Sequence, residues 1–455
     1  MVAKEKIERM PIVNPNAAGI DVGGRFHYVA IGQQNEDVKM FGVYTTDLHA
    51  IAKWLVSEGI TTIAMESTGD YWRSLYIILQ DYGLEVILVN GKYTKNVKGK
   101  KTDVQDCQWI QKLHSLGLLE SSFLPDSFTE SIRQVSRHRK NLLENAADYI
   151  SRMQKSLRQM NIRLDNVLRD VTGLSGQLII KAILDGERNA TKLVSLAHYN
   201  VHASKAEIEK ALTGDWRQEF LIELKHSFEL YHILQDKIQE CDKEIERLLA
   251  KEIEQRHGKR QLKSLKKSYD SYGRKRVNKN DPKIDLDRYS YELSGGIDLM
   301  QIPAMGRSTL LALISEVGLD VSKFPTYKQF SSWLGLSPNN KKSGGKIISS
   351  HTGKRKNRLS EALMRSANVI GNLKDNPLSE FFNRVAYKKG RMVAITAMAR
   401  KLSVIIYFML NRKQAYNYMP NEEYKEKIRL QRVKSIQKQI VNLGIKQQEI
   451  VFVTV

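Results

Sequence analysis

Four carboxylates in the first quarter of the chain have the residue types and spacing of a metal-binding group. Asp21 and Glu66 each end a short apolar run with the composition of a β-strand. Asp103 and Asp106 are three residues apart in a helical pattern, so they project from the same face of that helix. Carboxylate oxygens are the ligands that Mg²⁺ and Mn²⁺ prefer. Two such ions can hold the attacking and leaving oxygens of a phosphoryl transfer, and we expect a metal site for that chemistry.

Each of these acids also has a purely structural interpretation. A single aspartate at the end of a strand often accepts backbone N–H bonds in the turn that follows. Thr102 and Gln105 have the spacing of a capping box, and acids in a first helical turn are favoured by the helix dipole. The metal site is therefore favoured by the set of four acids and not by any single member.

The elements that must position these acids follow one another in the order βββαβαβ. Strand patterns fall at residues 17–22, 26–32, 38–44, 61–66 and 85–89, and helical patterns at about 46–59 and 71–82. Three meandering strands followed by alternating helices and strands predict a mixed sheet with one antiparallel edge. This order resembles that of the ribonuclease H-like α/β fold, in which Asp21 and Glu66 would end neighbouring strands.

The composition predicts a basic protein of the cytosol that binds a polyanion. The 455 residues carry a net charge of +22, which in a soluble protein most often serves nucleic-acid binding. Cys107 and Cys241 fit neither a disulfide framework nor a metal-binding spacing. The first ten residues lack the apolar segment of a signal peptide, and the apolar run Leu402–Leu410 is far shorter than a bilayer. We therefore expect a cytoplasmic location and no membrane partner.

The middle of the chain contains two long helical patterns and a basic stretch. Apolar spacing over 131–168 and 212–249 predicts paired helices, either a coiled-coil arm or an ordinary helical bundle. Residues 251–283 are rich in lysine and arginine and poor in apolar residues. They predict a linker that neutralises phosphates with a strong salt dependence.

Ser343 is a candidate nucleophile in the last third of the chain. It is followed by Gly344-Gly345 and flanked by Lys342 and Lys346. A hydroxyl on an open backbone among cations could attack an incoming phosphate, although Ser-Gly-Gly is also an ordinary loop composition. The further candidate nucleic-acid contacts are basic residues in loops, which could equally be solvated: Lys98, Lys100, Lys101, Arg274, Lys275, Arg276, Lys354, Arg355 and Arg358.

Together these motifs resemble those of the DEDD insertion-sequence transposases, which have a RuvC-like N-terminal domain and are related to the Piv DNA invertases. The N-terminal motifs are Gly-Ile-Asp21, Met65-Glu66-Ser67-Thr68-Gly69-Asp70-Tyr71-Trp72 and Lys101-Thr102-Asp103-Val104-Gln105-Asp106. The C-terminal motifs are Leu334-Gly335-Leu336-Ser337-Pro338, Ser343-Gly344-Gly345-Lys346, Gly390-Arg391-Met392 and Ala399-Arg400-Lys401-Leu402. The chain departs from the family at four positions. Relatives often have glycine where this chain has Ala304 and Lys356, arginine where it has Ser360, and alanine where it has Cys107.

The resemblance implies an enzyme that cleaves and rejoins DNA during transposition. It places the metal-binding, catalytic acids at Asp21, Glu66, Asp103 and Asp106, and the nucleophile at Ser343. It implies Mg²⁺ or Mn²⁺ as cofactor, a covalent phosphoserine intermediate and a composite site made of acids and serine. It further implies a homo-oligomer (a dimer or tetramer), donor and target DNA, and a guide RNA, called a bridge RNA, encoded by the element.

We expect five parts along the chain: a RuvC-like domain at 1–125, a helical or coiled-coil arm at 126–250, a basic linker at 251–290, a mainly helical transposase domain at 291–420 and a C-terminal tail at 421–455. Two other functions stay open. One is a metal-dependent Holliday-junction resolvase or nuclease in which Ser343 is structural. The other is a non-catalytic nucleic-acid-binding protein, against which the complete acid set argues.

Overall fold

The computed structural model describes residues 10–67, 69–94, 102–256, 277–350, 352, 357–417 and 421–444. The chain divides into two compact units, with the boundary between Leu124 and Pro125.

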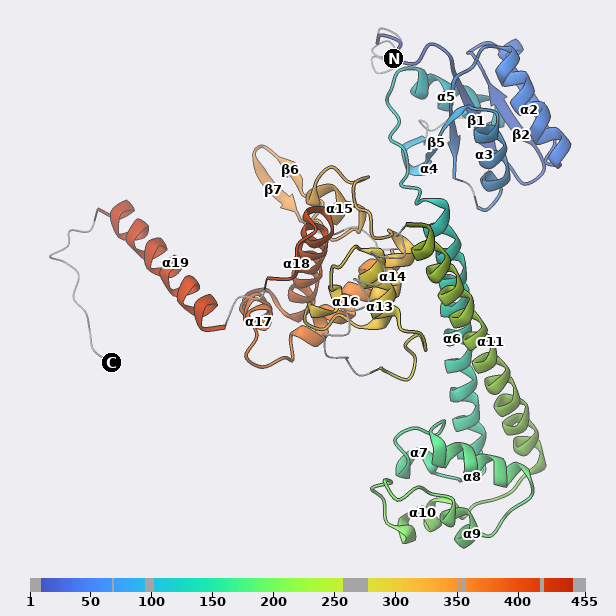
Figure 1. The fold of residues 1–455 in the computed structure, drawn as a ribbon, viewed down its shortest axis with the longest axis vertical. Helices are drawn as coiled ribbons and strands as arrows, with labels where there is room; N and C mark the ends of the chain where they lie inside the picture. Colours follow the sequence, from blue (N-terminus) through green and yellow to red (C-terminus); the bar gives the residue numbers. More distant parts are fainter. Residues whose placement is uncertain are drawn as a thin grey trace. The chain divides into compact units, whose positions relative to one another are not determined.

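Unit 1 is built around a five-stranded mixed sheet (Figure 1). Its strands lie in the order β3-β2-β1-β4-β5; β2 is antiparallel to both β1 and β3, while β4 is parallel to β1 and β5. The strands are β1 (Ala17–Val22), β2 (His27–Ala30), β3 (Val38–Phe41), β4 (Thr62–Glu66) and β5 (Glu85–Val89). This arrangement with flanking helices resembles the ribonuclease H-like fold, so the predicted fold class is confirmed.

The alternation of residues along β1 decides which helices cover each face of the sheet. Ala18, Ile20 and Val22 are buried in a core shared with two helices, whereas Gly19 lies against the backbone of a third helix. Side chains of successive strand residues point to opposite faces, so Asp21 shares the face of Gly19. The elements of unit 1 between and after the strands are η1 (Asn35–Asp37), α2 (Thr45–Ser57), α3 (Trp72–Asp81), α4 (Gly91–Thr94) and α5 (Asp103–Ser115).

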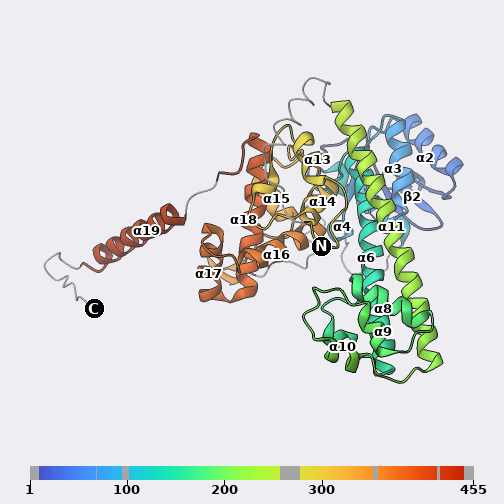
Figure 2. The ribbon, with the colours of Figure 1, turned by 60° about the horizontal axis from the view of Figure 1, so that its bottom comes forward.

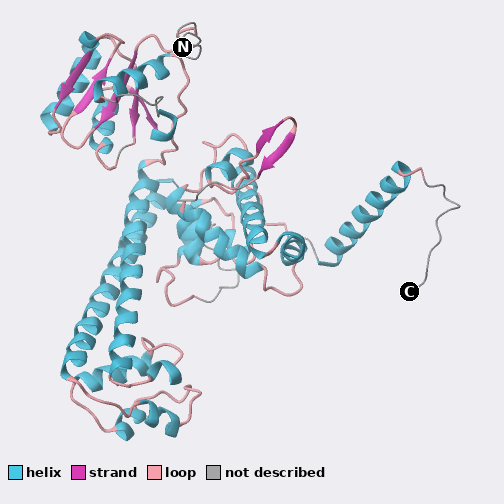
Figure 3. Ribbon diagram, turned by 180° about the vertical axis from the view of Figure 1, so that it is seen from behind, coloured by secondary structure: helices cyan, strands magenta, loops and turns pink. Residues whose placement is uncertain are grey.

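Unit 2 begins with two long helices that lie side by side, α6 (Ser127–Gln159) and α11 (Gln218–Arg256) (Figures 1 and 3). A buried ion pair joins them, in which Arg139 Nε donates to Asp242 Oδ1 at 2.6 Å. Short helices connect their far ends: α7 (Leu164–Val167), α8 (Leu174–Leu184), α9 (Ala190–Ser195) and α10 (Lys205–Ala211) (Figure 2).

The helical pattern predicted to run to residue 168 ends earlier than expected. Asn161 has a left-handed backbone, φ 55°, directly after α6. Met160, Ile162 and Leu164 are fully buried in a core that includes residues of α8 and α11. The apolar spacing therefore continues beyond the helix because these side chains fill a small helical bundle at the end of the arm. The region thus combines two long paired helices with a small helical bundle at their end.

In the rest of unit 2, the described elements are helices and one hairpin. Its elements are α13 (Leu286–Leu293), η2 (Leu299–Gln301), α14 (Arg307–Glu316), α15 (Tyr327–Trp333), β6 (Lys341–Ser343), β7 (Lys346–Ser349), α16 (Arg358–Ile370), α17 (Pro377–Lys389), α18 (Arg391–Arg412) and α19 (Asn421–Asn442). α14 packs against α6, and α18 contacts α15, α16 and α17. The mainly helical C-terminal region is as predicted.

The linker predicted over 251–290 overlaps helix at both ends. α11 continues to Arg256, and α13 begins at Leu286, which is fully buried. The basic composition therefore did not show where the flanking helices end. Residues 257–276 lie outside the described residues, and the five-part division of the chain stays a prediction.

Among the described residues one helix, α18, is long and apolar enough to cross a membrane. Half of it is buried inside the protein, and Tyr407 OH donates to the Phe324 carbonyl at 2.9 Å. Ser403 Oγ lies 2.9 Å from Ser331 Oγ on α15. Length and composition alone are weak evidence for a membrane span, because the core helix of a helical domain meets the same criteria.

Candidate active site

Helix α5 carries Asp103 and Asp106 to the edge of the sheet where β1 and β4 end. The helix runs against the direction of β1, because its last turn lies beside the residues that precede β1 and begin β4. There Asn14 Nδ2 donates to the His114 carbonyl at 2.7 Å, and Thr62 Oγ1 lies 2.9 Å from His114 Nε2. The first turn of α5 therefore lies toward the ends of β1 and β4. We call this edge, with Asp21, Glu66, Asp103 and Asp106, the acid edge.

The close approach of α5 to β1 depends on Gly19. A Cβ atom at this position would lie 2.5 Å from the Cys107 carbonyl oxygen and would also overlap the backbone nitrogen of Gln111. Real Cβ contacts are essentially never that short, and both neighbouring atoms belong to the backbone of a packed helix. The glycine before Ile20-Asp21 therefore sets the distance between the strand that carries Asp21 and the helix that carries Asp106.

The side-chain amides of the buried Gln111 and the exposed Gln33 hold α5 in its register on the sheet. Gln111 Nε2 donates to the Ala17 carbonyl at 3.1 Å and to the Ile31 carbonyl at 3.3 Å. Gln111 Oε1 accepts a hydrogen bond from Gln33 Nε2 at 2.6 Å. These contacts connect the helix to β1 and to the end of β2, so that rotation of α5 would leave buried polar groups without partners.

The thiol of Cys107 lies near two of the acids, Asp21 and Asp106. Burial raises the pKa of Cys107 to about 12, and the negative charges of Asp21 and Asp106 act in the same direction. The thiol donates to the Val104 carbonyl at 3.1 Å. Cys107 thus stays protonated at neutral pH and does not supply a thiolate ligand.

Glu66 is held by the short helix that follows β5. Its Oε2 accepts a hydrogen bond from Thr94 Oγ1 at 2.7 Å. A Cβ on Gly91 would lie 2.8 Å from the Glu66 Cδ atom, so a larger residue there would require the carboxylate to shift. Glu66 and Asp21 are both half-buried. Since β1 and β4 are parallel neighbours, their carboxylates extend from the same end of the sheet.

The donor chemistry of the acid edge fits a hard divalent cation, but the side chains do not form a closed cage. In the described part of the chain, no three or more His, Cys, Asp or Glu side chains gather closely enough to hold a metal ion. Glu66 is bonded to Thr94, and Asp103 is exposed in the first turn of α5. Oxygen-only ligands of this kind suit Mg²⁺ or Mn²⁺.

Ser343 lies in unit 2, at the end of β6 and beside a tight turn. It pairs with Lys346 across the β6–β7 hairpin, and the turn consists of Gly344 (φ 53°) and Gly345 (φ 77°). Positive φ at both central residues is typical of a type I′ turn, for which glycine is favoured. Every residue of this turn and of β6 is exposed. The Ser343 hydroxyl makes no hydrogen bond to the described residues.

The predicted basic contacts fall into two groups. Lys342 and Lys346 are exposed on the β6–β7 hairpin, and Arg358 is half-buried at the first position of α16. The others lie outside the described residues: Lys98, Lys100, Lys101, Arg274, Lys275, Arg276, Lys354 and Arg355.

Sequence reasoning did not find the residues that position the acids. Gly19 precedes the Ile20-Asp21 motif directly, and a glycine inside an apolar strand is a known sign of close backbone approach. Gln111 and His114 are polar residues on the buried face of α5. Their spacing from Cys107 along the helix was the available signal. The Thr94 contact with Glu66 joins residues 28 positions apart and left no local pattern.

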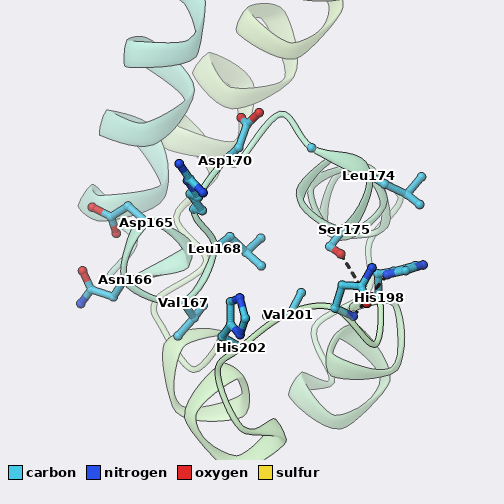
Figure 4. A pocket seen from close by; sticks show the side chains of 13 residues that line it. Asp165, Asn166, Val167, Leu168, Asp170, Leu174, Ser175, His198, Val201 and His202 are labelled. Atoms are coloured by element: carbon cyan, nitrogen blue, oxygen red, sulfur yellow. Dashed lines mark hydrogen bonds between the residues drawn. The ribbon is translucent and has the colours of Figure 1, made fainter. Parts of the chain in front are cut away.

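A cavity of about 690 Å³ lies at the end of the arm, among α7, α8 and the segment before α10 (Figure 4). Its carboxylates are already engaged: Asp170 accepts from Thr172 Oγ1 at 2.8 Å, and Asp165 accepts from Arg163 at 3.2 Å. The backbone N–H of His198 donates to Ser175 Oγ at 2.9 Å. None of the predicted site residues lines this cavity.

Two protein-family models match the chain, one over unit 1 and the first part of unit 2 and the other within unit 2. A DEDD transposase model of the IS110 group matches residues 18–162, which include all four acids. A model described as "Transposase IS116/IS110/IS902 family" matches residues 298–383, which include Ser343. The chain belongs to the IS110-type transposases. Among curated proteins, none matches it.

The family membership confirms the prediction of an insertion-sequence transposase, an enzyme that cleaves and joins DNA. Transposase domains of the DEDD type typically depend on divalent metal ions. The family models do not test the role of any single residue. The assignments of the four acids and of Ser343 in this transposase therefore remain predictions.

Proposed function

We propose that this transposase cleaves and rejoins DNA strands with the four carboxylates of the acid edge and with Ser343 as the nucleophile. The main support is the arrangement of unit 1, in which two strand ends and the first turn of α5 bring Asp21, Glu66, Asp103 and Asp106 to one edge of the sheet. The second support is the exposed hydroxyl of Ser343, which the described residues leave accessible to a DNA strand.

In the proposed reaction Ser343 Oγ attacks the phosphorus of a phosphodiester. An Oγ–P bond forms, the bond from phosphorus to the leaving sugar oxygen breaks, and that oxygen takes up a proton to become a free hydroxyl. The hydroxyl of another strand end then attacks the phosphoserine, which rejoins the strands and returns a proton to Ser343. A serine hydroxyl is a weak nucleophile at neutral pH, and this sequence shows no His–Asp relay beside it.

The acids would supply the activation that Ser343 lacks. We propose that Asp21, Glu66, Asp103 and Asp106 bind Mg²⁺ or Mn²⁺. Such ions, when bound, stabilise the negative charge on the oxygens of a phosphoryl transfer. To bind the metal, Glu66 would give up the hydrogen bond that it accepts from Thr94. The acids and Ser343 belong to different units, and their union in one composite site is part of the proposal.

The proposed partners are donor DNA, target DNA and a guide RNA encoded by the element, bound by a dimer or tetramer of the chain. The net charge of +22 supports a nucleic-acid partner without distinguishing RNA from DNA. The guide RNA and the oligomer rest on the resemblance to the family. Sequencing the RNA that co-purifies with the protein tests the first, and the mass of the complex in solution tests the second.

Covalent trapping on a nicked DNA substrate tests the nucleophile. We expect a phosphoserine adduct with the wild-type protein and none with Ser343→Ala. Ser337→Ala and Ser349→Ala are matched controls in the same region and should keep both adduct and recombination. A plain resolvase with a structural Ser343 would cleave without forming an adduct. A full yield of adduct in EDTA would separate the serine from the acids and disprove the composite site.

Substitution of the acids tests the metal site. We expect Asp21→Asn, Glu66→Gln, Asp103→Asn and Asp106→Asn each to abolish recombination while nucleic-acid binding is retained. Because the change removes clustered like charges, stability without metal should be unchanged or slightly higher. Mg²⁺ should raise the Tm of the wild-type protein more than that of the variants. Normal recombination by all four variants would contradict the assignment.

Neutralising the basic stretch tests its interaction with nucleic acid. We expect the triple variant of Arg274, Lys275 and Arg276 to glutamine to bind more weakly. The slope of log K against log[salt] should fall in magnitude by about one unit for each phosphate that the protein no longer neutralises. Chemistry on a saturated complex should persist. An unchanged slope would show that this stretch is a tether and not a binding segment.

A further inference from the structure

A small cavity of about 160 Å³ lies in unit 2 between α6, α14 and α16. Its lining includes four basic side chains, Arg139 and Lys140 from α6 and Arg358 and Arg365 from α16. One carboxylate, that of Glu316, also lines it. None of the three helices carries one of the four acids or Ser343, and of the lining residues only Arg358 is among the predicted nucleic-acid contacts.

Two of the four basic groups are already neutralised by neighbouring carboxylates. Arg139 forms the buried ion pair with Asp242, and Lys140 Nζ donates to Glu361 Oε2 at 3.2 Å. Lys140 also lies 3.6 Å from the exposed Glu144.

The one carboxylate of the lining is itself neutralised from α6. Arg137 donates to both Glu316 oxygens, at 3.1 and 2.7 Å, and Arg133 lies 3.7 Å from the same group. The negative charge of Glu316 is thus matched by arginines that do not line the cavity. Among the described residues, no carboxylate forms an ion pair with Arg358 or Arg365, the other two basic residues of the lining.

Arg358 and Arg365 have unused donors at the cavity. They are seven residues apart on α16, which places them on the same face two turns apart. The Nη1 atom of Arg358 is buried and has no hydrogen-bond partner among the described residues. Arg365 is exposed and forms no ion pair or hydrogen bond with the described residues. A buried N–H without an acceptor is costly, so Nη1 is a donor available to an acceptor beyond the described residues.

The size and the donors of the cavity define that acceptor. Drug-sized ligands occupy about 300–1,000 Å³, so this cavity is too small for a nucleoside and suits a single compact anion. Guanidinium groups bind phosphate oxygens in a two-pronged geometry. Ser136, half-buried on α6, adds a hydroxyl that the described residues leave unbonded. Two unpaired arginines and a hydroxyl are the donor set of a phosphate site.

We propose that this cavity binds one backbone phosphate of a nucleic acid and so anchors a strand on the C-terminal helical region. The proposal rests on the proposed function in one respect: the bound phosphate belongs to the DNA or RNA on which the transposase acts. DNA and RNA backbones offer the same group, and the test separates them. Donors from two packed helices, α6 and α16, would hold the phosphate at a fixed position.

The first test measures binding of the full-length protein to a fluorescent DNA duplex and to an RNA duplex of the same sequence over a range of salt concentrations. For the double variant Arg358→Gln/Arg365→Gln, the slope of log K against log[salt] should fall in magnitude by about one unit. A smaller slope with only one duplex shows which nucleic acid the cavity binds, and a smaller slope with both shows that it accepts either backbone. Arg412→Gln, exposed at the end of α18, removes a guanidinium outside the cavity and should leave the slope unchanged.

The second test needs no nucleic acid. Inorganic phosphate should raise the Tm of the wild-type protein more than chloride at equal ionic strength, because a ligand that binds the native state stabilises it. The double variant should lose this difference, and Arg365→Lys, which keeps the charge but not the two-pronged geometry, should lose part of it. The Tm in chloride shows that each variant is folded.

An unchanged salt slope together with unchanged phosphate stabilisation in the double variant would overturn the proposal. So would an equal decrease of the slope in Arg412→Gln, which would mean that only total charge matters. Both tests are independent of strand cleavage. Absence of a Ser343 adduct would therefore refute the proposed nucleophile and leave the result for this cavity intact.

Discussion

The acid edge of unit 1 and the β6–β7 hairpin of unit 2 carry the two parts of the proposed chemistry and are held in very different ways. Asp21, Glu66 and Asp106 are half-buried and extend from elements that are packed and hydrogen-bonded. Ser343 is exposed on a two-stranded hairpin whose Ile347 and Ile348 are also exposed. A hairpin of two strands without packing is marginally stable in water.

This difference indicates where each part acquires its geometry. A metal site must hold its ligands closely, which packed strands and helices can do before any substrate arrives. A nucleophile that must meet a DNA strand gains from accessibility and can be ordered by the bound strand, at an entropic cost on binding. We therefore expect substitutions beneath the acid edge to affect the stability of unit 1, and substitutions in the hairpin to affect chemistry alone.

The largest expected effect is that of Gly19→Ala. The new methyl group would overlap the α5 backbone at Cys107 and Gln111, and α5 would have to move away from β1. We expect a decrease of about 1–3 kcal/mol in the free energy of unfolding, or more, and a loss of recombination because Asp106 moves with the helix. Chemical denaturation of the full-length protein measures the first, and a recombination assay measures the second.

Gly306→Ala is the matched control for this substitution. Gly306 also has an ordinary backbone conformation, φ −118°, but a Cβ there meets nothing within 4 Å. As an N-cap change it should cost no more than about 1 kcal/mol. Equal effects of the two substitutions would show that α5 and β1 are less tightly packed in solution than the 2.5 Å approach at Gly19 requires.

Sequence patterns predicted the parts of this molecule that local periodicity determines. The succession of strands and helices in unit 1 followed from short apolar runs such as 17–22, and its resemblance to the ribonuclease H-like fold placed Asp21 and Glu66 on neighbouring strands. The end of α6 did not follow, because Met160, Ile162 and Leu164 continue an apolar pattern while the chain leaves the helix at Asn161. The buried residues of the arm's end bundle are close only in three dimensions.

The same limit applies to the candidate site. The types and spacing of the four acids were visible, whereas the atoms that hold them were not. Thr94 in α4 donates a hydrogen bond to Glu66 at the end of β4. Gln33, after β2, donates one to Gln111 in α5. Such contacts depend on the packing of elements that are distant along the chain. For Ser343 the Gly-Gly pair indicated an open backbone, and the structure places it in a tight hairpin turn.

A drop in pH should weaken unit 1 selectively, which is the second effect in size. The buried histidines among the described residues, His27 and His114, both lie in unit 1, and burial lowers the pKa of each below the usual 6.5. Below pH 6.5 the unfolded chain therefore binds protons that the folded unit does not. Their contribution is complete above that pH and is lost as pH falls through 6.5 toward the lowered folded values.

Hydrogen exchange of the full-length protein at pH 7.5 and 5.5, corrected for intrinsic rates, measures this effect region by region. Peptides from β1 and α5 should lose protection at the lower pH, while peptides from α14 and α18 should keep theirs. In His114→Gln, whose amide can still bond Thr62, the loss should be smaller. Equal loss in both units, or no change in the variant, would contradict the assignment to these histidines.

The smallest effect on stability, but a clear one on chemistry, is expected for Gly345→Ala in the hairpin turn. Gly345 has φ 77°, a conformation that costs an alanine about 1–2 kcal/mol, although nothing lies within 4 Å of the added Cβ. The strain would open the turn that places Ser343 beside Lys346. Because the hairpin is exposed and unpacked, the Tm of the whole protein should stay the same while the yield of covalent adduct falls.

Lys346→Ala, at an ordinary strand position, separates loss of charge from loss of the turn. A lower Tm in Gly345→Ala would show that the hairpin is packed in solution, and the contrast with the acid edge would then no longer hold.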